Sequence, residues 1–219
     1  MPQVYCDLTS GNQGWMLIGR FSNSDEKHWM NDTGYWWYDR VDAAGKTIDP
    51  KNDADMISPA FWLISGNDFK ITRSDDSHHT PLLQTTGNCL GDHTFRSKIT
   101  SYSDFRNGAV WPKNGCLGNC NVQYGGQYQI TEGYGQARCN GTLQSGDKIG
   151  FWCNMEWSSS VMMIGGGGSS CSEAGHGIGV TAAKLPSFKI RESGRHEKEF
   201  GNYQWFVATK NYALNLWIR

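Results

Sequence analysis

Seven cysteines constrain this chain more than any other feature of its sequence. They stand at wide and irregular spacings, whereas structural metal sites built on thiolates usually combine two closely spaced cysteine pairs. Only Cys116 and Cys120 are that close together, and no second pair follows. The pattern is therefore typical of a disulfide framework formed in an oxidising compartment, and a reduced intracellular protein is the alternative. The cysteines are Cys6, Cys89, Cys116, Cys120, Cys139, Cys153 and Cys171.

An odd number of cysteines leaves one thiol without a partner inside the chain. The sequence opens Met1-Pro2-Gln3 with no secretion signal, and we interpret it as N-terminally truncated, with the export signal and a partner for Cys6 on the missing part. The other cysteines are expected to form three intrachain disulfides, the most local of them closing a small ring. The expected pairs are Cys116–Cys120, Cys139–Cys153 and Cys89–Cys171.

The composition restricts the class of protein. The 219 residues carry a formal net charge of -1, from 20 basic and 21 acidic side chains. No apolar run comes near the ~20 residues of a membrane-spanning helix, and the absence of a basic excess argues against a nucleic-acid or anionic-membrane binder. The chain is rich in aromatic residues (10 Trp, 9 Tyr and 9 Phe), while only 19% of its residues are charged. That bias suits carbohydrate recognition, and an aromatic-rich core is the alternative explanation.

The order of apolar and turn-forming segments predicts a single domain over residues 1–219. Short apolar runs alternate with stretches rich in Gly, Asn and Ser, and no helical periodicity is sustained between residues 87 and 146. We therefore expect a loop-rich α+β or mainly β domain, with the glycine run at 165–168 as a natural loop. Strands are predicted at residues 3–6, 15–18, 61–72, 147–153, 161–164 and 212–218, the last of them closing the sheet.

The usual catalytic motifs are missing from the sequence. It has no G-x-S-x-G elbow, no H-E-x-x-H pair, no P-loop and no dinucleotide-binding glycine motif. The chain is therefore interpreted as a binding module and not as an enzyme. A secreted hydrolase is the alternative, because the two carboxylates of a glycosidase have no short sequence motif.

Acidic side chains gather in the loop that holds Asp53 and Asp55. Calcium prefers hard oxygen ligands on flexible loops, and this D-x-D pair places two carboxylates close together. The spacing does not match an EF-hand, and a solvated acidic loop is the alternative. We predict that Asp53 and Asp55 bind a calcium ion, with loop carbonyls and water completing its shell.

Three histidines carry different expectations. His78 and His79 are predicted to be an exposed loop pair. His176 lies between two glycines, and three roles remain open for it: a ligand, a hydrogen-bonding core residue or a solvent-facing turn residue. Glycosylation sequons at Asn31 and Asn140 agree with secretion.

Three blocks of sequence resemble known extracellular domains. Residues 4–18, VYCDLTSGNQGWMLI, resemble the opening of fibrinogen-like domains. Residues 164–168, IGGGG, followed by Cys171, are similar to a block of the intelectins (X-type lectins), and residues 213–219, ALNLWIR, resemble their C-terminal strand. The resemblance implies a fibrinogen-like α+β domain, with a twisted antiparallel sheet, short helices and long disulfide-tied loops. It also implies a secreted protein that binds calcium and sugar, often as a multimer, with Cys6 joined to an upstream cysteine.

The chain departs from the intelectin pattern at two places. Ser22-Asn23-Ser24 stands where intelectins have H-E-N, which helps to hold calcium, and Val161-Met162-Met163 stands where they carry an acid and a histidine. Methionine is not a calcium ligand. We therefore expect a pocket that depends less on metal, while the 49–55 loop lies near the place of an acidic calcium-binding stretch in the intelectins.

The chain is interpreted as a secreted, extracellular lectin for cell-surface or microbial glycans, with calcium as its cofactor. Assembly into a homo-oligomer is a further expectation. An extracellular matrix or adhesion protein that binds protein partners through the same fold is the alternative. The site is expected where the loop after Gly168 meets the C-terminal loop, with aromatic rings for the apolar face of a sugar and polar groups for its hydroxyls. Its predicted residues are Trp157, Tyr203 and Trp205 as the platform, and Glu156, Glu173 and His176 as polar partners.

Overall fold

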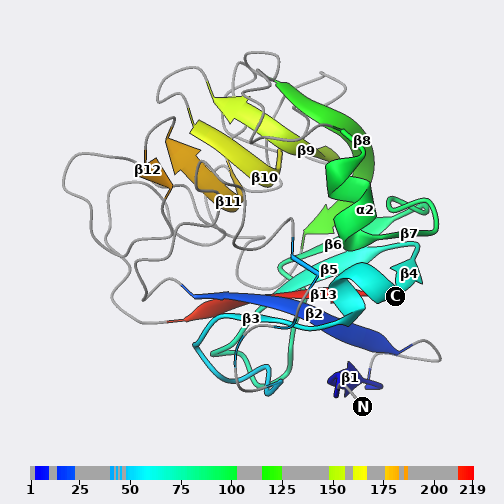
Figure 1. Ribbon diagram of the computed structural model, residues 1–219, viewed down its shortest axis with the longest axis vertical. Helices are drawn as coiled ribbons and strands as arrows, with labels where there is room; N and C mark the ends of the chain where they lie inside the picture. The colour runs from blue at the N-terminus through cyan, green and yellow to red at the C-terminus, as the bar shows by residue number, and fades with distance from the viewer. Residues whose placement is uncertain are drawn as a thin grey trace.

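The computed structural model of this chain contains a large antiparallel sheet with short helices beside it (Figure 1). The structure describes residues 3–9, 14–22, 40–41, 43, 45, 48–102, 115–124, 148–155, 160–166, 176–182, 185–186 and 212–219. Within these residues, eleven strands form the large sheet and two more form a small one. A mainly antiparallel sheet with few, short helices is compatible with the expected α+β class.

The strands of the large sheet run antiparallel to their neighbours throughout the described residues. They are β1 (Cys6–Asp7), β2 (Trp15–Ser22), β3 (Met56–Ile57), β5 (Phe69–Arg73), β6 (Leu83–Thr86), β8 (Gly115–Tyr124), β9 (Lys148–Met155), β10 (Ser160–Gly166), β11 (His176–Ala182), β12 (Leu185–Pro186) and β13 (Ala213–Ile218). The small sheet joins β4 (Ser65–Gly66) to β7 (His93–Thr94), and the helices are α1 (Ala60–Leu63) and α2 (Phe95–Thr100). The order in the large sheet is β1-β2-β13-β5-β6-β8-β9-β10-β11-β12, and β3 also pairs with β2.

Several predicted strands are present in the structure. The first hairpin is formed by β1 and β2, with Cys6 opposite Met16, and the strands expected at 147–153 and 161–164 are β9 and β10. The strand expected at 212–218 is β13. It lies inside the sheet between β2 and β5, so the prediction that it closes the sheet is wrong.

The prediction of one strand over residues 61–72 is right for residues 69–72, which lie in β5, and wrong for the start of the range. The chain instead makes a single helical turn, α1, before β4 and β5. Pro59 has a helical φ of -57°, as proline favours at the first turn of a helix, and the Ser58 carbonyl accepts the Phe61 amide (3.0 Å). Phe61 is buried and Leu63 is exposed, whereas residues two apart in a strand share a face.

Helix α2 was not predicted, because its six residues are too few to show a sustained period. Its start is determined locally by Thr94, whose side chain accepts the Ser97 amide (3.0 Å) as an N-cap. Phe95 and Ile99 are four residues apart, lie on the same face of the helix and are both fully buried.

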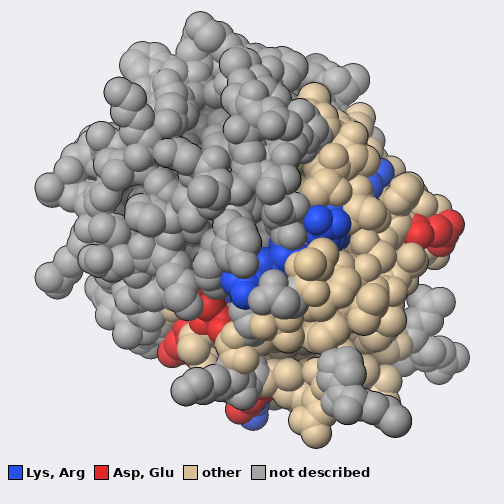
Figure 2. All heavy atoms as spheres, viewed as in Figure 1, with Lys and Arg blue, Asp and Glu red and all other residues tan. Residues whose placement is uncertain are grey.

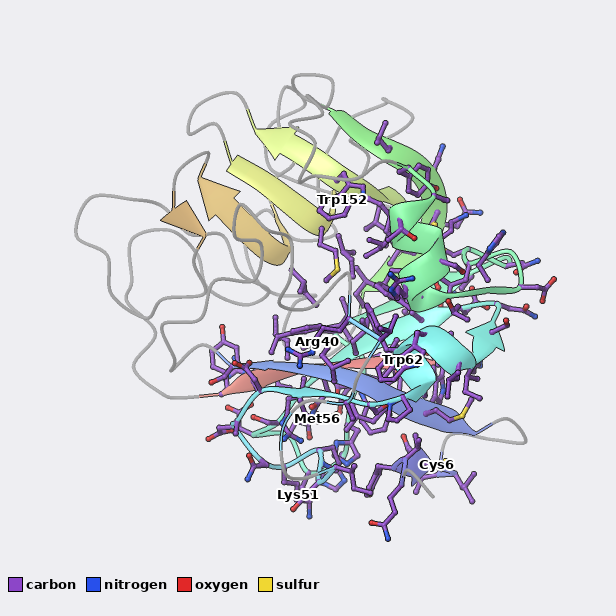
Figure 3. The ribbon with its side chains drawn as sticks, in the orientation of Figure 1. Cys6, Arg40, Lys51, Met56, Trp62 and Trp152 are labelled. Atoms are coloured by element: carbon purple, nitrogen blue, oxygen red, sulfur yellow. A yellow bond between two sulfur atoms is a disulfide. The ribbon has the colours of Figure 1, made fainter. Side chains whose placement is uncertain are left out.

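The main core lies on the face of β2, β13 and β5 that packs against both helices (Figure 1). The core also includes buried side chains of β6, β8, β9, β10 and β11. Aromatic rings are in close contact within it, such as Phe69 with Phe95 (centroids 5.4 Å apart, 88° between planes). Figure 3 shows Trp62 and Trp152 on this side of β2. The largest fully buried members are Phe21, Phe61, Trp152 and Tyr212.

One disulfide joins Cys89 to Cys120 in the described part of the chain, with Cα atoms 5.2 Å apart. The predicted pairs Cys116–Cys120 and Cys89–Cys171 are therefore wrong. Cys120, the expected partner of Cys116, and Cys89, the expected partner of Cys171, are joined to each other. The pairing of β6 with β8 instead brings Cys120 beside the turn that holds Cys89.

The remaining predictions about cysteines have different outcomes. Cys6 is exposed and forms no disulfide within the described residues, and its unpaired state in the whole chain stays a prediction. Cys139 lies outside the described residues, so the pair Cys139–Cys153 stays a prediction.

Candidate functional site

Most residues predicted to bind a glycan lie outside the described part of the chain. The exception is His176, the first residue of β11, whose backbone pairs with Gly166 at the end of β10. This register brings His176 beside the glycine run that was expected to line the pocket. The predicted residues outside the described part are Glu156, Trp157, Glu173, Tyr203 and Trp205.

The strand that leads to the glycine run is anchored in the core. Met163 and Ile164 of β10 and Ile178 of β11 are fully buried there. Met163 is one of the two methionines at which the sequence analysis noted a departure from the resembling pattern. Its side chain fills the core, so this position contributes packing to the hairpin and no ligand atom.

The predicted calcium loop, residues 49–55, lies against the sheet. Asp53 Oδ1 accepts the Ser74 hydroxyl (2.5 Å), and Asp55 Oδ1 accepts the Ser22 amide (2.8 Å). Asp55 is only 4% exposed. The two carboxylates therefore attach the loop to the end of β2 and to the turn after β5.

Arg20 of β2 holds the same loop through backbone oxygens. Its guanidinium donates from Nε to the Ala54 carbonyl and from Nη1 to the Asp49 carbonyl. One strand away, Asn215 Nδ2 donates to the Pro50 carbonyl (2.8 Å). Burial lowers the pKa of Arg20, and the loop carboxylates oppose that shift, so the loop is arranged around an internal cation.

Carboxylate and carbonyl oxygens are the ligands that calcium prefers, so the chemistry of this loop fits the ion. The carbonyls of Asp49 and Ala54 already accept Arg20, however, and a calcium ion bound to them would take the place of its guanidinium. Among the described residues, no three side chains of His, Cys, Asp or Glu gather closely enough to hold a metal ion. Calcium binding stays a prediction.

A second charged cluster was missed by the sequence analysis. Lys70 Nζ lies 2.9 Å from Asp7 Oδ2, with side chains 1% and 3% exposed, and 5.1 Å from the ring centroids of both Trp15 and Trp217. Burial would raise the pKa of Asp7, but hydrogen bonds from Thr9 and Lys70 lower it to about 2. Burial lowers the pKa of Lys70, and Asp7 opposes that shift. A lysine between Phe69 and Ile71 in a buried strand was the available signal.

Both clusters lie on the face of the sheet opposite the main core. Paired residues share a face, which places Arg20, Asn215 and Thr72 in one row and Trp217 beside Lys70 in the next. The N-terminal segment and the 49–56 segment cover this face, and Figure 3 shows Lys51, Met56 and Cys6 on its side of β2. We call it the loop-covered face, made of Trp15, Leu17, Arg20, Lys70, Thr72, Asn215 and Trp217.

The prediction of an exposed pair at His78 and His79 is half right. His78 is exposed, but His79 is only 8% exposed and its ring contacts Trp217 (centroids 5.4 Å apart). The reason is tertiary packing: the His79 ring lies against Tyr5 and Trp217, which come from distant parts of the chain, and the backbone of His79 is left-handed, with a φ of 51°.

Comparison with known proteins adds no identification, since no family model and no curated protein matches the chain. Neither described helix is long and apolar enough to cross a membrane. Function is therefore inferred from the chain's own residues.

Proposed function

We propose that this chain is a secreted, fibrinogen-like lectin domain related to the intelectins, which binds cell-surface or microbial glycans. The observation that carries the proposal is the register of β10 and β11, which sets His176 beside Gly166 in the block that resembles the intelectins. The other two resembling blocks also meet in the sheet, because β2 from the first pairs with β13 from the last.

The hairpin of β10 and β11 supplies groups of the kind that bind a sugar. Gly165 and Gly166 are paired with β9 and β11 on either side. In this proposal the backbone groups of Gly167 and Gly168, the next residues of the run, exchange hydrogen bonds with sugar hydroxyls. The imidazole of His176 can donate or accept one more, depending on its tautomer. In this proposal, Glu173 and Glu156 bond further hydroxyls, and Trp157, Tyr203 and Trp205 stack on the apolar face of the ring.

The charges of the chain agree with a neutral ligand. Figure 2 shows basic and acidic side chains on the same described face, with uncharged residues over most of it. Together with the formal net charge of -1, this supports a glycan over a nucleic acid as the ligand.

The proposal includes a calcium ion at Asp53 and Asp55, and assembly of several copies as in the implied family. In this proposal Asp53 and Asp55 would supply carboxylate oxygens to the ion, and loop carbonyls and water would complete its shell. Binding to the native state alone raises its stability, by about 2.7 kcal/mol at a calcium concentration of 100 times Kd. The melting temperature should therefore rise with calcium and return with chelator, and Asp53→Asn should abolish the rise. A melting curve that calcium does not move removes the ion from the proposal.

A glycan array, probed with calcium and again with chelator, tests the lectin function. We expect binding to a defined group of glycans, and His176→Ala should weaken it by about 1–3 kcal/mol if the imidazole contacts the sugar. His78→Ala is the matched control, since His78 is an exposed histidine on another loop. Absence of glycan binding in both conditions contradicts the proposal, and equal binding by both variants places the site elsewhere.

A further inference from the structure

Three rings meet where the N-terminal segment, residues 3–9, covers the sheet. The Tyr5 ring lies edge-on to Trp217 (centroids 5.9 Å apart) and to His79 (6.3 Å), and His79 also contacts Trp217. Each ring comes from a different part of the chain. His79 therefore stands between the segment and the sheet, and the lectin site described above does not use it.

The turn that carries His79 is fixed by the carboxylate of Asp76. Asp76 accepts the His78 amide at Oδ1 and the Thr80 amide at Oδ2 (both 2.9 Å), and its carbonyl accepts the His79 amide (3.1 Å). His79 is held in the left-handed region, which is unusual for a residue with a side chain. The imidazole is thus presented to Tyr5 by a rigid turn.

The imidazole is adapted to its neutral form. It is 92% buried, since 8% of its surface is exposed, and among the described residues its Nδ1 has no hydrogen-bond partner. A proton on Nδ1 would create a buried charged donor without an acceptor, which is unfavourable. Its ring neighbour Trp217 already has the Lys70 ammonium over its face, so a second cation would add repulsion.

The charges around His79 come from every segment packed against it. Asp7 of β1 and Asp76 of the turn favour the protonated form, while Lys70 of β5 and Lys51 of the 49–55 loop disfavour it. Burial is the largest influence, and it lowers the pKa of His79 below its ordinary value of 6.5.

We propose that His79 is a proton-operated latch on the N-terminal segment: the neutral imidazole holds Tyr5 against the sheet, and protonation loosens the segment. The segment is otherwise attached by the pairing of β1 with β2, by the Asp7–Lys70 pair and by the Leu17 amide, which donates to the Tyr5 carbonyl (2.9 Å). In the closed state the segment covers His79, and in the open state the segment has left the sheet. Because His79 is protonated more easily in the open state, the closed state loses stability as the pH falls below 6.5. The loss ends at the lowered pKa that His79 has in the closed state. Acidification would then free the strand that carries the exposed thiol of Cys6.

Hydrogen exchange tests the latch in the whole chain between pH 8 and pH 5, after correction for intrinsic exchange rates. Protection of the Leu17 amide should fall below pH 6.5, by at most about tenfold per pH unit for one proton. Amides of β13 should stay protected, which distinguishes local opening from unfolding. His79→Gln should remove the pH dependence, and His78→Gln, at the exposed neighbour, should retain it.

Two outcomes would overturn the proposal. One is a protection factor of the Leu17 amide, corrected for intrinsic exchange, that does not change with pH or that changes by the same amount in the wild type and in His79→Gln. The other is seen in the wild-type protein alone: an NMR titration of the imidazole that places the pKa of His79 at 6.5 or above.

Discussion

Arg20 and Lys70 are both fully buried on the loop-covered face, two strands apart, yet their charges are compensated differently. Arg20 donates to two backbone carbonyls of a loop, with carboxylates nearby. Lys70 forms an ion pair with Asp7 and lies against two indole rings.

The difference follows from the shape of the two cations. A guanidinium is a planar fork with donors in fixed directions, so it can hold two carbonyls of one loop in place. An ammonium is a compact charge without a preferred plane, so one carboxylate and flat aromatic faces suit it better. Arg20 therefore organises a loop, whereas Lys70 anchors a strand.

The largest expected effect is from Asp7→Asn, which leaves the Lys70 ammonium buried without its counter-ion. Removing one partner of a buried pair costs about 3–5 kcal/mol, and urea denaturation of the variant would measure this loss. Adding Lys70→Met should restore part of the stability, because no unpaired charge remains. A cost below about 1 kcal/mol for Asp7→Asn would show that the pair behaves like an exposed one.

A smaller loss is expected from Arg20→Lys, which keeps the charge and removes the fork. Losing a hydrogen bond from a charged group costs about 1.5–3 kcal/mol, and this variant cannot make both bonds of the guanidinium. The loss is measured in the same denaturation assay. The control is Asp75→Asn, which breaks the exposed pair with Arg73 and should cost less than about 1 kcal/mol. Equal losses in the two variants would contradict the role given to Arg20.

The smallest effect is the acid dependence that Asp7 contributes. The pKa of Asp7 is lowered from 3.8 to about 2, so its stabilisation is complete above pH 4 and is lost as the pH falls to about 2. The shift corresponds to about 2 kcal/mol. The free energy of unfolding, measured from pH 5 to pH 2, should fall more in the wild type than in Asp7→Asn. Parallel curves would mean that Asp7 titrates normally.

Local patterns predicted part of this fold. Period-two alternation indicated β9 and β13, and the polar turn between apolar runs indicated the β1–β2 hairpin. For the proposed glycan site, sequence reasoning suggested residues, and the structure describes only the backbone of His176 among them.

Tertiary structure decided what depends on residues far apart in the chain. Cys120 pairs with Cys89 because β6 and β8 are neighbours, and no spacing in the sequence contains that adjacency. Lys70 and Asp7 are 63 residues apart, and only the sheet order brings them together. The sequence by itself indicated some of the short strands, among them β9, β10 and β13, since alternation is a local property. Packing decided the partners of the buried charges, the burial of His79 and the place of β13 in the sheet, because each depends on which distant segments lie on the same face.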